Sequence, residues 1–299
     1  MYPTIKLLSH SSINSLQSCP RRYELTKLVR REKTNTIHTM YGTVVGIGFA
    51  EYFLSKDINL AKLKMLIAWE LPDLYDADVK SGKSLLTAYH AIDRLANNID
   101  ISEKYNGWIV PSFADKPAVE LSFSIDLGDG YFYRGFIDLV LYNPESKKYT
   151  VLECKTTGSY TIYEAAYGNS DQAVAYGIIL DAIANDVPEY NVDYLVYGTR
   201  NKAWEVLSFK KAKSSRAKFF ADLMVRTEII NLYGTLPYFP TNGSSCITFS
   251  SRCEFYSICT LPTDKLVGAL PEFDWVKEQA QWDFNFTLGE LLNIELENV

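Results

Sequence analysis

Three acidic residues and one lysine in the middle of the chain are the first candidates for chemistry. Asp138 and Glu153 stand 15 positions apart, Lys155 follows two residues later, and Glu120 precedes them. Carboxylate oxygens are the ligands that Mg²⁺ and Mn²⁺ prefer in proteins. Like charges that face one another destabilise a fold unless a cation lies between them. These residue types predict a divalent-metal site if the chain brings the side chains together.

The surrounding sequence predicts the strands that would do so. Residues 119–156 show the period-two alternation of β-structure, and in residues 119–127 every odd position is apolar and every even one polar. Gly128-Asp129-Gly130 predicts a tight turn, and residues 143–148 predict a loop before the next strand. We expect the two hairpins to close at the pairs Leu127–Tyr131 and Tyr142–Tyr149.

This register brings the charged side chains into one row. The first hairpin sets Glu120 opposite Asp138, and the second sets Asp138 opposite Glu153. Lys155 shares their face because side chains alternate along a strand, whereas Cys154 points the other way. A polar strand face with charges distributed by chance is the alternative, and the position of Lys155 favours a site.

These residues resemble a known family. Gly135-Phe136-Ile137-Asp138, a hairpin and Leu152-Glu153-Cys154-Lys155 are similar to the D…ExK core of the PD-(D/E)XK nucleases, with Ile137 where the family name has proline. Asp171–Tyr176 is similar to the QxxxY motif of the RecB-like branch, with Gln172 and Tyr176 one helical turn apart. Residues 12–23 resemble the opening helix of that branch, and the similarity extends in outline from Leu7 to Thr260.

The resemblance implies an α/β fold: a restriction-endonuclease-like core with a central mixed sheet flanked by helices, plus terminal segments joined by a cysteine cluster. It implies metal-dependent hydrolysis of DNA, most simply by an exonuclease that uses Mg²⁺ or Mn²⁺. The implied catalytic residues are Asp138, Glu153, Lys155, Gln172 and Tyr176. The implied metal ligands are Asp138, Glu153 and the Cys154 carbonyl, and the strand register adds Glu120. Lys155 would orient the attacking water or stabilise developing charge, and Gln172 with Tyr176 would position the strand being cut.

Four further cysteines sharpen the resemblance. Cys19 lies near the start of the chain, and Cys246, Cys253 and Cys259 form a C-x6-C-x5-C segment. One early and three late cysteines resemble the iron–sulfur nucleases of the AddB and CRISPR-adaptation type, in which they hold a [4Fe–4S] cluster. The x6 gap departs from that pattern, which has two residues there. Unligated buried thiols and a Zn²⁺ site are the alternatives.

A second departure concerns the early helix. RecB-like enzymes usually carry G-x3-H there, and this chain has Gly42 followed by Gly46 in the histidine position. Glu120 or water would then complete the metal site. The alternative function is a weakly active or inactive descendant that binds DNA or a partner protein and keeps the metal cluster as a structural clip. His10, His38 and His90 are expected to be ordinary polar residues.

The net charge of −6 excludes a protein that coats nucleic acid through its overall charge. Two basic zones nevertheless carry +5 each, in residues 1–40 and 201–218. They could line a path for DNA, although a solvated charged face is the alternative. The candidate DNA-binding residues are Arg21, Arg22, Arg30, Arg31, Lys210, Lys211 and Lys213.

Helical periodicity outside the sheet completes the expected layout. The expected helices are Ser12–Leu28, Tyr41–Leu54, Leu60–Glu70, Ser84–Asn97, Asp171–Asn185 and Lys210–Leu232. We expect one nuclease domain over residues 1–262. No stretch approaches the roughly 20 apolar residues of a membrane span, and no apolar signal segment opens the chain. This predicts a cytoplasmic protein. The resemblance implies an enzyme of a bacterium or its virus that acts on DNA with a free end or a single strand, with a recombination or replication protein as a further partner.

Residues 263–299 form an acidic tail with a net charge of −6. Its acids and aromatic residues could imitate nucleic acid or bind a partner. Leucines at positions 288, 291, 292 and 296 instead favour a last helix packed on the core, which is the default expectation. The aromatic residues are Phe273, Trp275, Trp282, Phe284 and Phe286.

Overall fold

The computed structural model describes residues 6–28, 36–71, 82–168, 170–184, 187, 189–248, 251–262 and 282–293. The chain divides into two compact units. Unit 1 comprises residues 1–34, 122–135 and 216–299, and unit 2 comprises residues 35–121 and 136–215. The long strands β4 and β5 contribute residues to both units.

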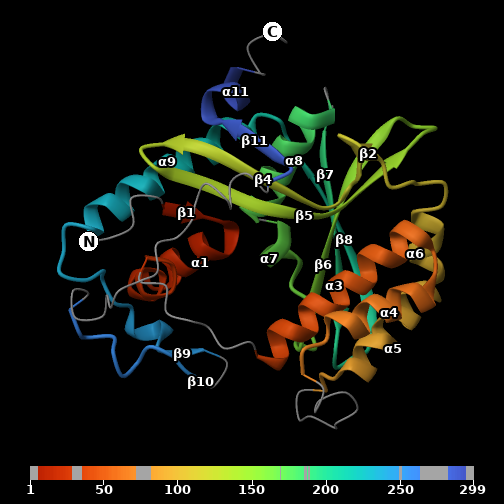
Figure 1. The fold of residues 1–299 in the computed structure, drawn as a ribbon, viewed down its shortest axis with the longest axis horizontal. Helices are drawn as coiled ribbons and strands as arrows, with labels where there is room; N and C mark the ends of the chain where they lie inside the picture. Colours follow the sequence, from red (N-terminus) through yellow and green to blue (C-terminus); the bar gives the residue numbers. More distant parts are fainter. Residues whose placement is uncertain are drawn as a thin grey trace. The chain divides into compact units, whose positions relative to one another are not determined.

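The main sheet is mixed and has seven strands in the order β11-β4-β5-β6-β7-β8, with β1 also paired to β5 (Figure 1). Its strands are β1 Lys6–Leu8, β4 Val119–Gly128, β5 Tyr131–Asn143, β6 Lys148–Thr157, β7 Tyr190–Gly198, β8 Ala203–Lys211 and β11 Phe284–Thr287. Two small sheets pair β2 Ser112–Phe113 with β3 Lys116–Pro117, and β9 Ile247–Thr248 with β10 Ser251–Arg252. A mixed sheet with flanking helices confirms the predicted α/β class.

The two predicted hairpins are present. Gly128 and Gly130 adopt φ of 86° and 76° at the first turn, a conformation that costs glycine little because it has no Cβ. Tyr142 pairs with Tyr149 in the antiparallel ladder of β5 and β6, as the register predicts. After the second hairpin the chain crosses over through α7 and α8, and β7 pairs with β6 in parallel.

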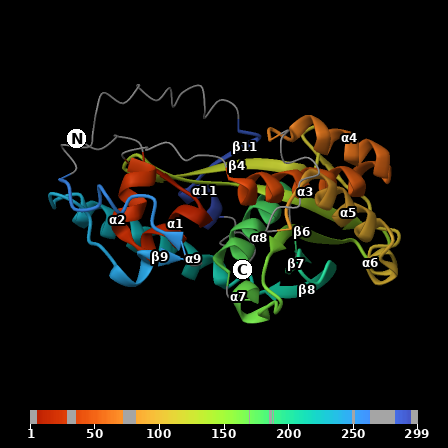
Figure 2. The same ribbon diagram turned by 90° about the horizontal axis from the view of Figure 1, so that it is seen from below.

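Helices cover both faces of the sheet in unit 2 (Figures 1 and 2). The helices α3 Ile37–Ser55, α4 Ile58–Ala68, α5 Leu85–Ala96 and α6 Ile99–Lys104 share one apolar core with β5 to β8. Cys154 packs against this core, whereas its neighbour Glu153 contacts α8 Asp171–Ala184. Neighbouring strand residues point to opposite faces, so α8 lies on the face opposite α3; it is preceded by α7 Glu164–Gly168.

Unit 1 contains α1 His10–Ser18, α2 Pro20–Tyr23, a π-helical turn Glu24–Leu28, α9 Ser215–Tyr233, a 3₁₀ turn Gly243–Ser245 and α11 Leu288–Asn293. The single helix predicted for residues 12–28 is therefore wrong in detail. Cys19 is extended, with φ −158°, and Pro20 begins a new helix at a position where its missing N–H costs nothing. None of the helices in the described ranges combines the length and the apolar surface that crossing a membrane requires.

The described part of the tail packs on unit 1, as the default expectation has it. β11 pairs in parallel with residues 123–126 of β4. Leu291 is fully buried in α11, and its carbonyl accepts a hydrogen bond of 3.2 Å from the buried Arg216. Phe273 and Trp275 lie outside the described residues, so the nucleic-acid mimic stays a hypothesis.

Candidate active site and cysteine pocket

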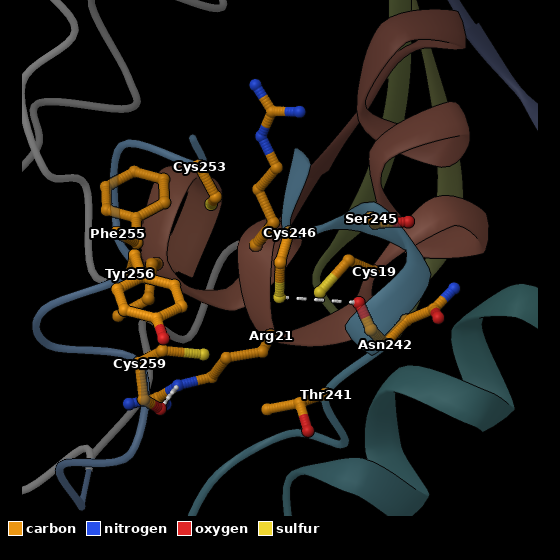
Figure 3. A pocket seen from close by; sticks show the side chains of 12 residues that line it. Cys19, Arg21, Thr241, Asn242, Ser245, Cys246, Cys253, Phe255, Tyr256 and Cys259 are labelled. Atoms are coloured by element: carbon orange, nitrogen blue, oxygen red, sulfur yellow. Dashed lines mark hydrogen bonds between the residues drawn. The ribbon is translucent and has the colours of Figure 1, made fainter. Parts of the chain in front are cut away.

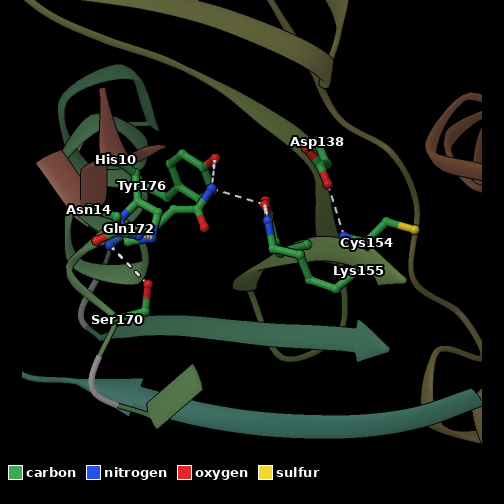
Figure 4. A network of polar contacts seen from close by, with 9 residues as sticks. His10, Asn14, Asp138, Cys154, Lys155, Ser170, Gln172 and Tyr176 are labelled. Carbon is green, nitrogen blue, oxygen red and sulfur yellow. Dashed lines mark hydrogen bonds and ion pairs between the residues drawn. The ribbon is translucent and has the colours of Figure 1, made fainter. Parts of the chain in front are cut away.

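The carboxylate row lies where β5 and β6 diverge. The antiparallel ladder between the two strands ends at the pair Leu139–Leu152, while β6 continues beside β7 as far as Thr157. Beyond the ladder the Cys154 N–H donates to Oδ2 of Asp138 at 2.9 Å (Figure 4). A carboxylate therefore replaces a backbone carbonyl as the partner of β6, and this opens a polar gap in the sheet.

Glu153 occupies the centre of this gap. Its side chain is 2% exposed, and Oε1 accepts hydrogen bonds from Lys155 Nζ and from Gln172 Nε2, the latter at 2.9 Å. Oε2 is buried and has no hydrogen-bond partner within the described ranges. An unpartnered buried carboxylate oxygen is costly, and a bound cation would satisfy it.

Gln172 connects this carboxylate to α8. Its Nε2 also donates to Tyr176 Oη at 2.5 Å, and its backbone N–H donates to Ser170 Oγ at 3.2 Å at the start of the helix (Figure 4). Tyr176 is only 4% exposed. Tyr176 and Gln172 thus form a chain of hydrogen bonds that ends on Glu153, and the role predicted for them in holding a DNA strand stays a prediction.

The charges of the site are strongly coupled. Burial, and then the charge of Asp138, raises the pKa of Glu153 to about 8. Burial also raises the pKa of Asp138, against the opposing effects of Lys155 and the Cys154 N–H. Burial acts to lower the pKa of Lys155, but the charges of Glu153 and Asp138 outweigh it and raise the pKa, so the ammonium stays protonated. The site contains more carboxyl groups than one lysine can neutralise, which favours a divalent cation.

Glu120 completes the row from β4. The Val140 N–H donates to the Ala118 carbonyl at 2.9 Å, which agrees with the predicted register and sets Glu120 beside Asp138. Glu120 adopts φ 49°, an uncommon conformation for a residue other than glycine and a source of local strain. Glu120 is exposed as a residue, but the partial desolvation of its carboxyl beside the strands, followed by the charge of Asp138, raises the pKa of Glu120. Even so, no three His, Cys, Asp or Glu side chains in the described ranges are arranged to hold a metal ion.

The four remaining cysteines line one pocket of unit 1 (Figure 3). Cys19 contributes from the break between α1 and α2, and Cys246, Cys253 and Cys259 contribute from the C-terminal loop segment. The Cys253 N–H donates to the Cys246 carbonyl at 2.8 Å. Burial raises the pKa of Cys259; Arg21 opposes this effect, and the other three thiols add to it. Cysteines far apart in sequence therefore line one pocket, but among the described residues no three of them are arranged to hold a metal ion, and the cluster stays a prediction.

Arg21 lies beside this pocket and does not reach a surface. Its side chain is fully buried and donates to the carbonyls of Cys259 and Leu261 at 2.9 and 2.5 Å and to Glu24 at 2.5 Å. The assignment of Arg21 to a DNA path is wrong, because a buried guanidinium offers no donor to a phosphate. Glu24 is not among the residues predicted from the sequence, and it also accepts a hydrogen bond from the Phe239 N–H at 2.8 Å. The signal for it in the sequence is the i,i+3 spacing from Arg21.

The other basic candidates are partnered to different extents. Lys213 pairs with the buried Asp181 at 3.2 Å, and Lys211 donates to the Gly168 carbonyl, so both have structural roles. Lys210 and Arg22 are more open and make surface ion pairs with Glu189 at 3.2 Å and Glu254 at 3.5 Å. Lys210 and Lys211 lie in β8, so the helix predicted from residue 210 begins instead at Ser215. Arg30 and Arg31 lie outside the described residues.

Gly46, at the position of the missing histidine, lies within α3. A Cβ built there would meet nothing within 4 Å, so the helix has room for a side chain. Nδ2 of Asn14 and Nε2 of His10 form an exposed hydrogen bond of 3.0 Å.

One comparison with known proteins identifies the family of this chain. The family model described as the PD-(D/E)XK nuclease superfamily matches residues 7–260. A solved structure from Eubacterium rectale, described as "Putative exonuclease", shares 13% sequence identity with this chain. The match covers 92% of this chain and 93% of that chain, with a TM-score of 0.47. A search of the curated proteins finds no match.

Proposed function

Because the chain belongs to the PD-(D/E)XK nuclease superfamily, we propose that it is a metal-dependent DNA nuclease that degrades DNA from its ends. One observation carries the proposal: Asp138, Glu153 and Lys155 converge where β5 and β6 diverge, with Oε2 of Glu153 buried and unpartnered within the described ranges.

The donor set fits Mg²⁺ or Mn²⁺, which prefer oxygen ligands. Asp138 and Glu153 would hold the ion with the Cys154 backbone carbonyl, and Glu120 would add a further carboxylate. When bound, the ion polarises a phosphodiester and lowers the pKa of a coordinated water. The raised pKa values of Glu153 and Glu120 mean that binding must displace protons from these carboxyls.

The remaining residues act on orientation and charge. The Lys155 ammonium is held by Glu153 Oε1 and, because it stays protonated, stabilises negative charge that develops on the phosphate. Gln172 shares that oxygen and prevents the Glu153 carboxylate from rotating. Tyr176 in turn fixes the Gln172 amide.

The cysteine pocket supports a finer assignment to the RecB-like branch with an iron–sulfur cluster. Four thiols from both ends of the sequence line one pocket, and four thiolates are the donor set of a [4Fe–4S] cluster. The cavity measures about 30 Å³, and no three thiols in the described residues are arranged around one ion, so either a cluster or a single Zn²⁺ ion would require the cysteine side chains to rearrange. Bound metal would clip Cys19 to the segment from Cys246 to Cys259.

Metal analysis tests the clip. Protein purified without oxygen should be brown and contain about four irons and four sulfides per chain, and Cys253→Ser should lose the colour and lower the Tm. Stoichiometric zinc in colourless protein would replace iron but keep the clip. Metal-free protein with an unchanged Tm in Cys253→Ser would leave only buried thiols.

The proposed setting is the processing of DNA ends during recombination or repair, with a recombination or replication protein as partner, in the cytoplasm of a bacterium or its virus. This setting follows from the resemblance to RecB-like nucleases.

Linear and circular DNA separate the functional alternatives. Wild-type protein with Mn²⁺ should shorten end-labelled linear DNA and leave a covalently closed circle of the same sequence intact. Cutting of the circle would indicate an endonuclease. Binding of both DNAs without any cleavage would favour the inactive descendant that Gly46 suggests.

A further inference from the structure

Two exposed tyrosines follow the catalytic strand. We name residues 158–163, between β6 and α7, the tyrosine loop; Tyr160 is 71% exposed and Tyr163 is 69% exposed. The loop begins three residues after Lys155, and α8 with Gln172 follows it closely. In the sequence, the tyrosine loop thus lies between Lys155 and Gln172, whose side chains both donate hydrogen bonds to Glu153.

Hydrogen bonds fix the base of the loop. The Ser159 N–H donates to Thr157 Oγ1 at 3.1 Å, and Ser159 Oγ donates to the Thr161 carbonyl at 2.8 Å. The Thr199 N–H, in the turn after β7, donates to the Thr157 carbonyl at 2.8 Å. The loop is therefore anchored to the end of β6, and its rings are held out in solvent rather than folded onto the core.

Arg200 supplies a positive charge at this loop. Its guanidinium carbon lies 4.9 Å from the centroid of the Tyr160 ring, which is within the range of a cation–π interaction. Arg200 is itself exposed, so its donors remain accessible. An aromatic ring next to an arginine is the combination that binds single-stranded nucleic acid, because the ring stacks on a base and the cation contacts the backbone.

The loop is close enough to the carboxylates to act on the same strand. Tyr160 follows Lys155 by five positions, and five residues span at most about 18 Å when fully extended. Stacked nucleotides advance about 3.4 Å each along one strand. Tyr160 thus lies within about five nucleotides of the phosphate at the carboxylate centre.

We propose that Tyr160, Tyr163 and Arg200 form a base-stacking site for the unpaired DNA strand that enters the carboxylate centre. The inference rests on the proposed nuclease function and names its substrate class: single-stranded DNA, including a frayed end. Paired bases in a duplex present only their edges to a protein, so two outward rings contribute to binding only where bases are unpaired.

Equilibrium binding without divalent metal tests the site independently of cleavage. The probes are fluorescein-labelled dT20, an abasic strand with the same number of phosphates, and a 20-bp duplex. Tyr160→Ala should weaken dT20 binding by about 5- to 140-fold, the range that corresponds to about 1–3 kcal/mol per stacked base. Its affinity for the abasic strand and the duplex should stay within twofold of wild type.

Matched variants separate the ring from its surroundings. Tyr160→Phe keeps the stacking surface and should bind dT20 like wild type, and Ile67→Ala on α4 removes an equally exposed apolar side chain (76%) without effect. Arg200→Gln should weaken dT20 and abasic-strand binding alike and reduce the salt dependence by about one counterion. Melting curves should show all four variants folded.

Two results would overturn the inference. An unchanged affinity of Tyr160→Ala for dT20 would show that the rings serve another partner. An equal loss on dT20 and the abasic strand would show that the residue shapes a phosphate contact instead. Failure of the proposed function is a separate outcome, because it appears as absence of metal-dependent cleavage while these binding differences persist.

Discussion

Replacement of Glu153 by glutamine is expected to stabilise the protein at alkaline pH in EDTA. The side chain is 2% exposed, and burial, with the charge of Asp138, raises the pKa of its carboxyl from 4.5 to about 8. An acid with a higher pKa in the folded chain binds its proton more tightly there, so stability falls as the pH rises from about 4.5 to about 8. Glutamine has nearly the same shape and no proton to lose.

The structure gives the size of the effect. The interval from 4.5 to about 8 corresponds to about 5 kcal/mol at 1.36 kcal/mol per pH unit. This pKa already includes the opposing effect of the paired Lys155 ammonium, which stabilises the ionised carboxylate. A chain of this size changes its Tm by roughly 1.5–2 °C per kcal/mol, so we expect a shift of several degrees and at most about 10 °C.

Melting curves at pH 5 and pH 9 in EDTA measure this shift in Tm. The control is Glu145→Gln, in the exposed turn between β5 and β6. The Tm of Glu153→Gln minus that of wild type should become more positive by several degrees from pH 5 to pH 9, and the control should follow wild type. Added Mg²⁺ should raise the Tm of wild type but not of Glu153→Gln. Parallel curves for all three proteins would refute the coupled-carboxylate account.

Three further predictions concern the surroundings of the site. Gln172→Ala removes a hydrogen bond to a charged carboxylate and should slow single-turnover DNA cleavage by about 10- to 100-fold. Tyr176→Phe should slow cleavage less, because Gln172 keeps its hydrogen bond to Glu153. Equal rates in both variants and wild type would contradict the role of Gln172. Gly46→Ala should raise the Tm, since glycine costs about 0.5–1 kcal/mol within a helix and a Cβ at this position meets nothing within 4 Å; an unchanged or lower Tm would contradict this. Truncation after residue 281 removes β11 and Leu291, whose carbonyl accepts a hydrogen bond from the buried Arg216. The truncation should lower the Tm and leave the DNA affinity of the folded fraction unchanged. Tighter DNA binding at low salt would instead support a nucleic-acid mimic.

The central hairpins could be predicted because their signals are local. Alternation in residues 119–127 and the glycine turn determine β4 and its connection to β5. The pair Tyr142–Tyr149 follows from the length of the second loop. These two registers place Asp138 beside Glu153 before any tertiary structure is known.

Other features depend on partners distant in sequence. Lys210 and Lys211 fit a helical pattern, but pairing with Asn191 and Tyr190 of β7 extends β8 through them. In the sequence, Arg21 looks like an ordinary surface arginine. Only folding brings it to the Cys259 carbonyl, 238 positions away. The sequence shows that Arg21 is charged but not that its side chain is removed from water, so its burial could not be predicted.

Single-turnover cleavage of end-labelled linear DNA by Glu153→Gln at saturating Mn²⁺ tests the central claim most directly. Loss of a buried metal ligand should reduce the rate by about 10³-fold or more, with the fold intact and Glu145→Gln as fast as wild type. Wild-type rates in Glu153→Gln would contradict the assignment of the carboxylate centre as the nuclease active site.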